Sequence, residues 1–235
     1  MALYKAKEEE RGKFCFFDKS LDEAAHCRQQ IEREMRLALE RDEFELYYQP
    51  KVAAADGSVS GAEALIRWNH PERGLVGFIE FIPIAEANRF IVPIGEWVLR
   101  TASAQLVAWQ RAGLKIKNCS INMSPVQVAS AKLLETFNKV VAETGVDPAF
   151  LEIEITESAL MNRIASIVRV LRELRRRGVA ISVDDFGTGY SSLVHMKQLP
   201  LDKLKIDRSF VMNIENDSED AAFTKAIVAL GQSMD

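Results

Sequence analysis

The sequence has few cysteines and histidines, and it has no excess of positive charge. Its cysteines are odd in number and lack the paired spacing of a zinc site, so we expect reduced thiols at Cys15, Cys27 and Cys119. No metal role is expected for the histidines, which are scattered along the chain as His26, His70 and His195. A net charge of -4 and a pI near 5.6 exclude a broad nucleic-acid surface but allow a small anionic ligand held through metals.

Long apolar runs are also missing. No stretch approaches the roughly 18 residues of a membrane span, and the charged N-terminus lacks the apolar core of a signal peptide. We therefore expect a soluble, cytoplasmic segment, in a parent protein that another part could tether to a membrane. With 235 residues and 48% hydrophobic content, the chain is long enough for one sizeable domain with an attached extra segment.

Hydrophobic periodicity predicts an alternation of strands and helices. Strands are expected over residues 44–52, 59–68, 116–122, 150–155, 179–183 and 203–206. Helices are expected over residues 79–88, 95–112, 125–144, 164–177 and 219–232, with a short helix from Ser191. An earlier amphipathic helix over residues 21–41 is expected to link two domains, or to act as a solvated connector.

Repeated βα units predict an α/β fold with a parallel sheet, either open or closed as a barrel. We favour a TIM-like (β/α)8 barrel, because polar residues fall at the carboxyl ends of nearly every strand. The first two strands are close enough to form a hairpin through Asp56-Gly57. Only six strands are found where a closed barrel needs eight, so we expect the domain to be incomplete after the sixth strand-helix unit.

The polar residues at the strand ends indicate a metal site. Two adjacent acids, Asp184 and Asp185, end a buried strand and would repel each other unless a cation lay beside them. Oxygen-bearing or basic side chains recur on the other strands at Glu63, Asn122, Glu152, Glu154, Glu157, Lys205 and Asp207. Singly, each is most simply a surface or capping residue. Their recurrence on consecutive strands favours a site for a hard divalent cation.

Two other enzyme classes were weighed on the same residues. The D-F-G segment from Asp185 occurs in protein kinases, but no glycine-rich loop, V-A-I-K or H-R-D segment accompanies it. A lysine at a strand end, such as Lys205, could form a Schiff base with a carbonyl substrate. The neighbouring acids make a metal site the better interpretation.

Seven segments carry a family resemblance, in order and at family spacing. They are Y-Q-P-K, E-A-L-I-R-W, F-I-P-I-A-E, I-N-M-S-P, E-I-T-E-S, D-D-F-G-T-G-Y-S-S-L and L-K-I-D-R-S-F. From residue 43 to residue 235 the chain resembles an EAL domain, the family of cyclic di-GMP phosphodiesterases. The resemblance implies a modified TIM barrel whose first strand is antiparallel, and hydrolysis of cyclic di-GMP to linear pGpG. A catalytically silent receptor for cyclic di-GMP is the alternative.

The resemblance also implies roles for individual residues. It implies two Mg²⁺ or Mn²⁺ ions, held by Glu63, Asn122, Glu154, Asp184 and Asp185. It gives catalytic roles to Lys205 beside the attacking water, to Asp185, and to Glu157, which steadies the loop after Asp185. Substrate contacts are implied for Gln49, Arg67 and Asp207. The family's later glutamate, in an A-E-G-V-E segment, has no counterpart up to Asp235.

The resemblance extends to partners. Residues 1–19 resemble the closing part of a GGDEF (diguanylate cyclase) domain through A-L-Y-K-A-K, with Glu10-Arg11-Gly12 in place of the usual Gly-Arg-Asn. We therefore expect residues 20–42 to be a linker helix between a GGDEF domain and the EAL domain of a tandem protein. A homodimer is expected through the loop after Asp185 and neighbouring helices.

Overall fold

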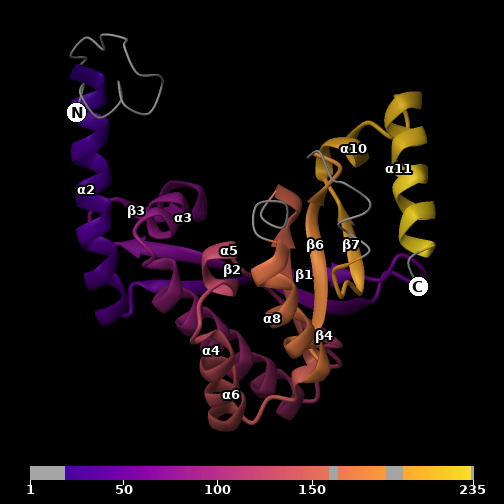
Figure 1. The fold of residues 1–235 in the computed structure, drawn as a ribbon, viewed down its shortest axis with the longest axis horizontal. Coiled ribbons are helices and arrows are strands. Elements are labelled where there is room, and N and C mark those ends of the chain that lie inside the picture. Colours follow the sequence, from indigo (N-terminus) through magenta and orange to yellow (C-terminus); the bar gives the residue numbers. More distant parts are fainter. Residues whose placement is uncertain (1–18, 159–163, 189–197, 234–235) are drawn as a thin grey trace. The chain divides into compact units, whose positions relative to one another are not determined.

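The computed structural model describes residues 19–158, 164–188 and 198–233 (Figure 1). The described residues form two compact units, the first ending at residue 45 and including residues 67–90, and the second made of residues 46–66 and the described residues from 91 onward. Strands β1 (Phe44–Val52) and β2 (Val59–His70) each contribute to both units. Among the described helices, none has the length and apolar character needed to cross a bilayer. The predicted GGDEF remnant and the helix from Ser191 lie outside the described residues.

The first unit is built on a small aromatic core. It contains α2 (Lys19–Glu40), β3 (Gly74–Gly77) and α3 (Phe78–Ala87), with β3 antiparallel to the end of β2. The rings of Phe44, Trp68 and Phe81 lie 5.6 to 5.8 Å apart and are almost fully buried. Met35 and Ala38 of α2 are fully buried, so the C-terminal half of this helix belongs to the core of the unit.

His70 also helps to fix α2 in the first unit. Its Nδ1 atom accepts hydrogen bonds from the backbone N–H groups of Glu72 and Arg73, and its Nε2 atom lies 3.1 Å from Glu34 of α2. His70 is the last residue of β2, two residues beyond the predicted end of that strand, and it is buried. The two hydrogen bonds that Nδ1 accepts indicate a structural role for His70.

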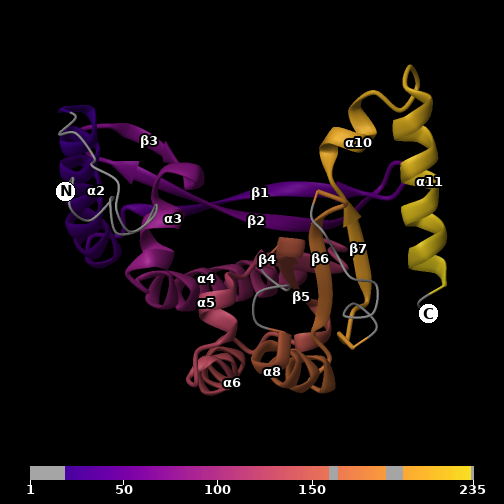
Figure 2. The same ribbon diagram turned by 45° about the horizontal axis from the view of Figure 1, so that its top comes forward.

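The second unit holds the rest of the sheet. The strand order is β1-β2-β4-β5-β6-β7, with β4 (Asn118–Asn122), β5 (Leu151–Thr156), β6 (Ala180–Phe186) and β7 (Lys203–Ile206). From β2 to β7 neighbouring strands are parallel. Backbone hydrogen bonds from Ala53 to Ser58 and from Asn69 to Glu43 show that β1 runs antiparallel to β2. The described strands therefore form an open mixed sheet, and the expected α/β class with an antiparallel first strand is confirmed (Figure 2).

Helices cover this sheet because the strands are apolar. At most 2% of the surface is exposed for each of the strand residues Ile121, Ile153, Ile155, Ile181 and Val183. Helix α4 (Ile91–Arg111) packs on β4 and on α6 (Leu133–Thr144), α8 (Ile164–Arg176) packs on β6, and α11 (Ser218–Gln232) lies along β7. The remaining short elements are α5 (Pro125–Val128), the 3-10 turn η1 (Pro148–Phe150) and α10 (Arg208–Met212).

Most predicted elements occur within a few residues of their predicted bounds, but one helix was wrong. The single helix expected over residues 125–144 is two helices, α5 and α6. A capping box between Ser124 and Gln127 begins α5, which packs between α4 and α8 and ends at Val128. The chain then turns to lay α6 on α4, so packing overrides the helical periodicity. Strand β3 and helix α10 were not predicted.

Candidate functional site

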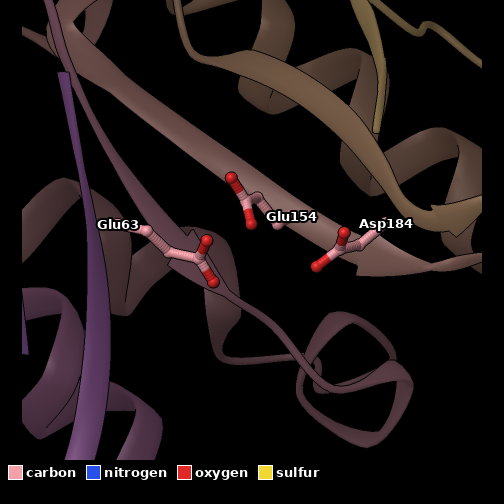
Figure 3. A group of neighbouring side chains, drawn as sticks. All are labelled: Glu63, Glu154 and Asp184. Atoms are coloured by element: carbon pink, nitrogen blue, oxygen red, sulfur yellow. The ribbon is translucent and has the colours of Figure 1, made fainter. Parts of the chain in front are cut away.

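Three carboxylates converge within the sheet of the second unit. Glu63 of β2, Glu154 of β5 and Asp184 of β6 each contribute one oxygen to a group in which all these atoms lie within 4.8 Å of one another. Figure 3 shows the three side chains directed toward one another from their separate strands. Parallel pairing brings their strands side by side, with the acids staggered along the sheet. Glu63 pairs with Ser120 of β4, whereas Glu154 pairs with Asn122 of β4 and Asp184 pairs with Thr156 of β5.

Lys205 of β7 lies at the centre of this carboxylate group. Its Nζ atom is 3.3 Å from Glu63 Oε2 and 2.9 Å from Asp184 Oδ2, and it also contacts Glu154 Oε2. Burial acts against the charged amine, but hydrogen bonds to Glu154 and Asp184 outweigh it and raise the pKa of Lys205. The ammonium group is therefore a fixed positive charge among three acids.

Glu154 is the most buried of the three acids, with no exposed surface. Burial opposes its ionisation, but hydrogen bonds from Lys205 and Lys51 outweigh that effect and lower the pKa of Glu154. Asn122 of β4 completes the group, because its Nδ2 atom donates to Glu63 Oε1 at 2.7 Å. Glu154 is thus held in its ionised form, and the group is internally hydrogen-bonded.

A bulge places the two adjacent aspartates. The β6–β7 register shifts between Val183 and Phe186, so that Asp184 and Asp185 together lie opposite Lys205. Asp185 has a φ of 53°, the left-handed region that aspartate tolerates better than most residues, and its side chain is exposed. Partial burial, followed by the charges of Asp184 and Asp207, raises the pKa of Asp185. The two aspartates therefore have different surroundings, and Asp185 lies outside the group of three.

Glu157 reaches the loop that follows the aspartates. It is 2% exposed, and its Oε2 atom accepts a hydrogen bond from the backbone of Gly187 at 2.8 Å. Gly187 has a φ of 104°, and a Cβ atom there would lie 2.9 Å from the rings of Phe210 and Phe223. Only glycine fits this turn without strain. Glu157 thus holds the first residue after the strand that carries Asp184.

A second polar layer lies toward the N-terminal ends of β5 and β7, where Glu152 and Lys203 each precede a residue of the first group by two positions. Glu152, fully buried, accepts hydrogen bonds from Asn118 Nδ2 at 2.6 Å and from Lys203, and it lies 3.5 Å from Lys51 Nζ. Gly61 makes room for this layer, because a Cβ atom at that position would lie 2.0 Å from Asn118 Oδ1. Glu152 and Glu154 lie on the same face of β5, as strand alternation requires, and both contact Lys51. The sequence pattern assigned no role to Lys51 or Lys203.

The three residues predicted to contact the substrate lie in different surroundings. Gln49 lines a cavity of about 400 Å³ together with Lys51, Glu63 and Lys205. Asp207 is the N-cap of α10, where its side chain accepts hydrogen bonds from the Ser209 hydroxyl and from the Ser209 N–H at 2.9 Å, and both lower the pKa of Asp207. Arg67 belongs to the first unit, where its guanidinium carbon lies 5.7 Å from the centre of the Phe78 ring.

The donor chemistry of the carboxylate group fits a hard divalent cation. All of its charged ligating atoms are carboxylate oxygens, which Mg²⁺ and Mn²⁺ prefer, and no histidine or cysteine belongs to it. The Lys205 ammonium is a stand-in that shows the same oxygens gathered around a positive charge. Glu63, Glu154 and Asp184 are therefore the residues of this unit best placed to hold such an ion.

Comparison with known proteins identifies the family. A sequence profile of the EAL domain matches residues 32–235, and the chain belongs to the EAL domain family. It is 43% identical over 233 residues to the bifunctional diguanylate cyclase/cyclic di-GMP phosphodiesterase MucR of Pseudomonas aeruginosa, covering 99% of this chain and 34% of MucR. It is 34% identical over 233 residues to the cyclic di-GMP phosphodiesterase PdeR of Escherichia coli, covering 99% of this chain and 35% of PdeR. The chain thus spans about a third of these relatives.

Solved structures support the same assignment. The EAL structure described as "PaMucR Phosphodiesterase, c-di-GMP complex" matches with a TM-score of 0.82 and 44% identity, over 87% of this chain and 83% of that one. An EAL enzyme, Bd1971, solved with cAMP and cyclic di-GMP bound, matches with a TM-score of 0.83 and 35% identity, over 90% of this chain and 58% of that one. The EAL fold is therefore shared over about nine-tenths of the chain.

Proposed function

We propose that this EAL domain hydrolyses cyclic di-GMP to linear pGpG in bacterial second-messenger signalling. The observation that carries the proposal is the convergence of Glu63, Glu154 and Asp184 around Lys205, in a chain of the EAL family. Relatives named as cyclic di-GMP phosphodiesterases support the choice of substrate. A cyclic dinucleotide carries two phosphodiester groups, and its negative charge suits a site that combines cations with a lysine.

Two Mg²⁺ or Mn²⁺ ions complete the proposed site. Glu63, Asn122, Glu154 and Asp184 would hold one ion, and Asp184 with Asp185 would help to hold the second. Bound divalent cations supply positive charge at a phosphodiester and lower the pKa of water. The hydrogen bonds that keep Glu154 ionised in a fully buried position support its assignment as a ligand, because a metal ligand must be deprotonated.

The remaining roles belong to side chains around this group. Lys205 places its ammonium where negative charge would develop on the phosphate, and preorganised charges of this kind stabilise transition states. Gln49, on the cavity beside Lys205, would contact the nucleotide, as would Arg67 and Asp207. Glu157 would steady the loop that positions Asp185, and its hydrogen bond to Gly187 supports that role.

The proposal extends to the protein that carries this domain. We place a GGDEF remnant in residues 1–19, a linker helix in residues 20–42 and the EAL domain in residues 43–235. The bifunctional relative MucR supports a tandem arrangement with a GGDEF domain. Homodimerisation through the loop after Asp185 is part of the same proposal, and most of that loop lies outside the described residues.

The test is hydrolysis of cyclic di-GMP, followed by chromatography of the nucleotides. The protein should include any residues that its gene encodes beyond Asp235. We expect Mg²⁺-dependent or Mn²⁺-dependent formation of pGpG, abolished by Glu63→Ala or Asp184→Ala and retained by Glu135→Ala, which changes an exposed glutamate on α6. Turnover that persists in excess chelator would refute the metal-dependent mechanism. Binding of cyclic di-GMP with no hydrolysis would select a receptor function instead.

A further inference from the structure

Lys51 is a partly buried lysine at the meeting point of the two polar layers. It extends from β1, and its Nζ atom lies 2.7 Å from Glu154 Oε1 and 3.5 Å from Glu152 Oε1. The same atom donates to Ser120 Oγ of β4. Its side chain is 25% exposed, whereas both glutamates are fully buried. A lysine in contact with two such acids is held by them and is not a mobile surface group.

The two oxygens of Glu154 have different partners. Oε1 accepts a hydrogen bond from Lys51, while Oε2 contacts Lys205, the lysine that also contacts Glu63 and Asp184. Oε2 is therefore the oxygen on the side of the carboxylate group. The terminal torsion of a glutamate has a broad, roughly two-fold profile, so a partner on one oxygen is needed to fix the direction of the other.

We propose that Lys51 is a positioning residue for Glu154, which holds Oε1 so that Oε2 faces the divalent cation. This inference rests on the metal site of the proposed function. Lys205 occupies the centre of the three carboxylates, where a cation would compete with it, whereas Lys51 approaches Glu154 from the opposite oxygen. Lys51 can therefore keep its contact when a cation is present. It offsets the charge of a carboxylate that has no access to water.

The second layer supports Lys51 in turn. Ser120 and Glu152 contact its ammonium, and Glu152 is held by Asn118 and Lys203. Partners of this kind, which orient a metal ligand without touching the metal, typically change metal affinity by about 10- to 100-fold when they are removed. Lys203 provides a matched comparison, since it contacts Glu152 but has no contact with Glu154 among the hydrogen bonds of the described residues.

The experiment measures Mn²⁺ binding to the 235-residue chain by electron paramagnetic resonance, without substrate. We expect Lys51→Met to weaken binding by about 10- to 100-fold. Lys51→Arg, which keeps a cation at the position, and Lys203→Met should stay within about fivefold of wild type, below the usual range for a group that orients a ligand. The spectrum of bound Mn²⁺ at saturation should change in Lys51→Met and not in Lys203→Met, because only the former frees a ligand.

Several outcomes would overturn the inference. Binding by Lys51→Met that equals or exceeds wild type would show that Lys51 does not position Glu154, and an equal loss in Lys51→Arg would show that its charge is not the cause. If Lys51→Met does not fold, as judged by circular dichroism, Ser120→Ala decides instead. It should weaken binding by about 10-fold, the lower end of that range, and binding within about fivefold of wild type would refute the role. A wild-type chain that binds no Mn²⁺ would refute the proposed metal site itself.

Discussion

Replacing Lys205 with methionine tests whether the three carboxylates are held together as charged groups. The substitution keeps the length of the side chain but removes the ammonium that contacts Glu63, Glu154 and Asp184. Two unit charges 4.8 Å apart, the upper limit in this group, interact by about 3.5 kcal/mol at an effective dielectric constant near 20. Without Lys205, this repulsion between the carboxylates is no longer compensated at the centre of the group.

Proton uptake limits the cost of that repulsion. Neutralising an ordinary glutamate at pH 7, against a pKa of about 4.3, costs about 3.7 kcal/mol, so the group would bind a proton once repulsion exceeds this value. Loss of one partner from a buried ion pair typically costs about 3 to 5 kcal/mol, which agrees with that limit. We therefore expect metal-free Lys205→Met to lose about 3 kcal/mol of stability. For a chain of this size, that corresponds to a melting temperature lower by about 6 to 12 °C.

Differential scanning fluorimetry in chelator, at pH 7, measures the effect. Lys139→Met, at an exposed position on α6, is the matched control and should melt close to wild type. Mg²⁺ should raise the melting temperature of Lys205→Met more than that of wild type, because the ion meets no competing ammonium. A Lys205→Met protein as stable as wild type in chelator would refute the reasoning.

The pH dependence has a defined sign. The folded-state pKa of Glu154 is lowered from 4.5, so its stabilisation is present above pH 4.5 and is lost as the pH falls through the lower folded-state value. The difference in stability between wild type and Lys205→Met should therefore be full at pH 7 and should shrink as the pH falls. Proton uptake by the variant becomes less costly below pH 7, and below pH 4.5 the wild type also loses the stabilisation from Glu154. Urea unfolding at several pH values measures it, and a difference that grows on acidification would contradict the assignment.

Three further predictions concern other parts of the chain. Gly187→Ala meets two phenylalanine rings at a φ of 104° and should cost about 1 to 3 kcal/mol in urea unfolding, more than Gly113→Ala, which has space and a φ of 82°. Cys119 is fully buried, and burial raises its pKa to about 12. In a variant with the other cysteines replaced by serine, it should react with a thiol reagent only as fast as the protein unfolds locally. Rapid labelling would contradict this. Met35→Ala, in the buried half of α2, should cost about 2 to 5 kcal/mol, whereas Leu37→Ala, 38% exposed, should cost under about 1 kcal/mol; equal melting temperatures would place α2 outside the core.

The convergence of the three carboxylates could be predicted from the sequence, because it depends on two regular features of strands. Alternation along a strand assigns Glu152 and Glu154 to one face, and parallel pairing brings Glu63, Glu154 and Asp184 together. Alternation acts over a few residues, and parallel pairing follows from the repeated strand-helix units, which the sequence pattern shows. The specific roles in catalysis, metal binding and substrate contact remain predictions that rest on family resemblance.

The features that the sequence did not predict depend on contacts between distant residues. Lys51 is 101 and 103 positions from the two glutamates that it contacts. A lysine on an edge strand is usually solvated, and nothing in its local pattern distinguishes this one. The register shift that places Asp184 and Asp185 opposite Lys205 is likewise a property of the β6–β7 pair. The pattern of each single strand therefore identifies the acids but not the lysines that contact them from other strands.

The balance of charge between the two layers links these observations to function. Four carboxylates, those of Glu63, Glu152, Glu154 and Asp184, face three ammonium groups, those of Lys51, Lys203 and Lys205. Among the described residues, Lys203 contacts Glu152 of the second layer, Lys205 contacts Glu63, Glu154 and Asp184, and Lys51 contacts both Glu152 and Glu154. Glu152 in the second layer would therefore keep its contacts with Lys51 and Lys203 if a metal ion took the place of Lys205 among Glu63, Glu154 and Asp184. A divalent cation bound among Glu63, Glu154 and Asp184 would replace the contacts of Lys205 with these acids. The Lys205 ammonium would then be free to face a phosphate, while Lys51 would continue to hold Glu154.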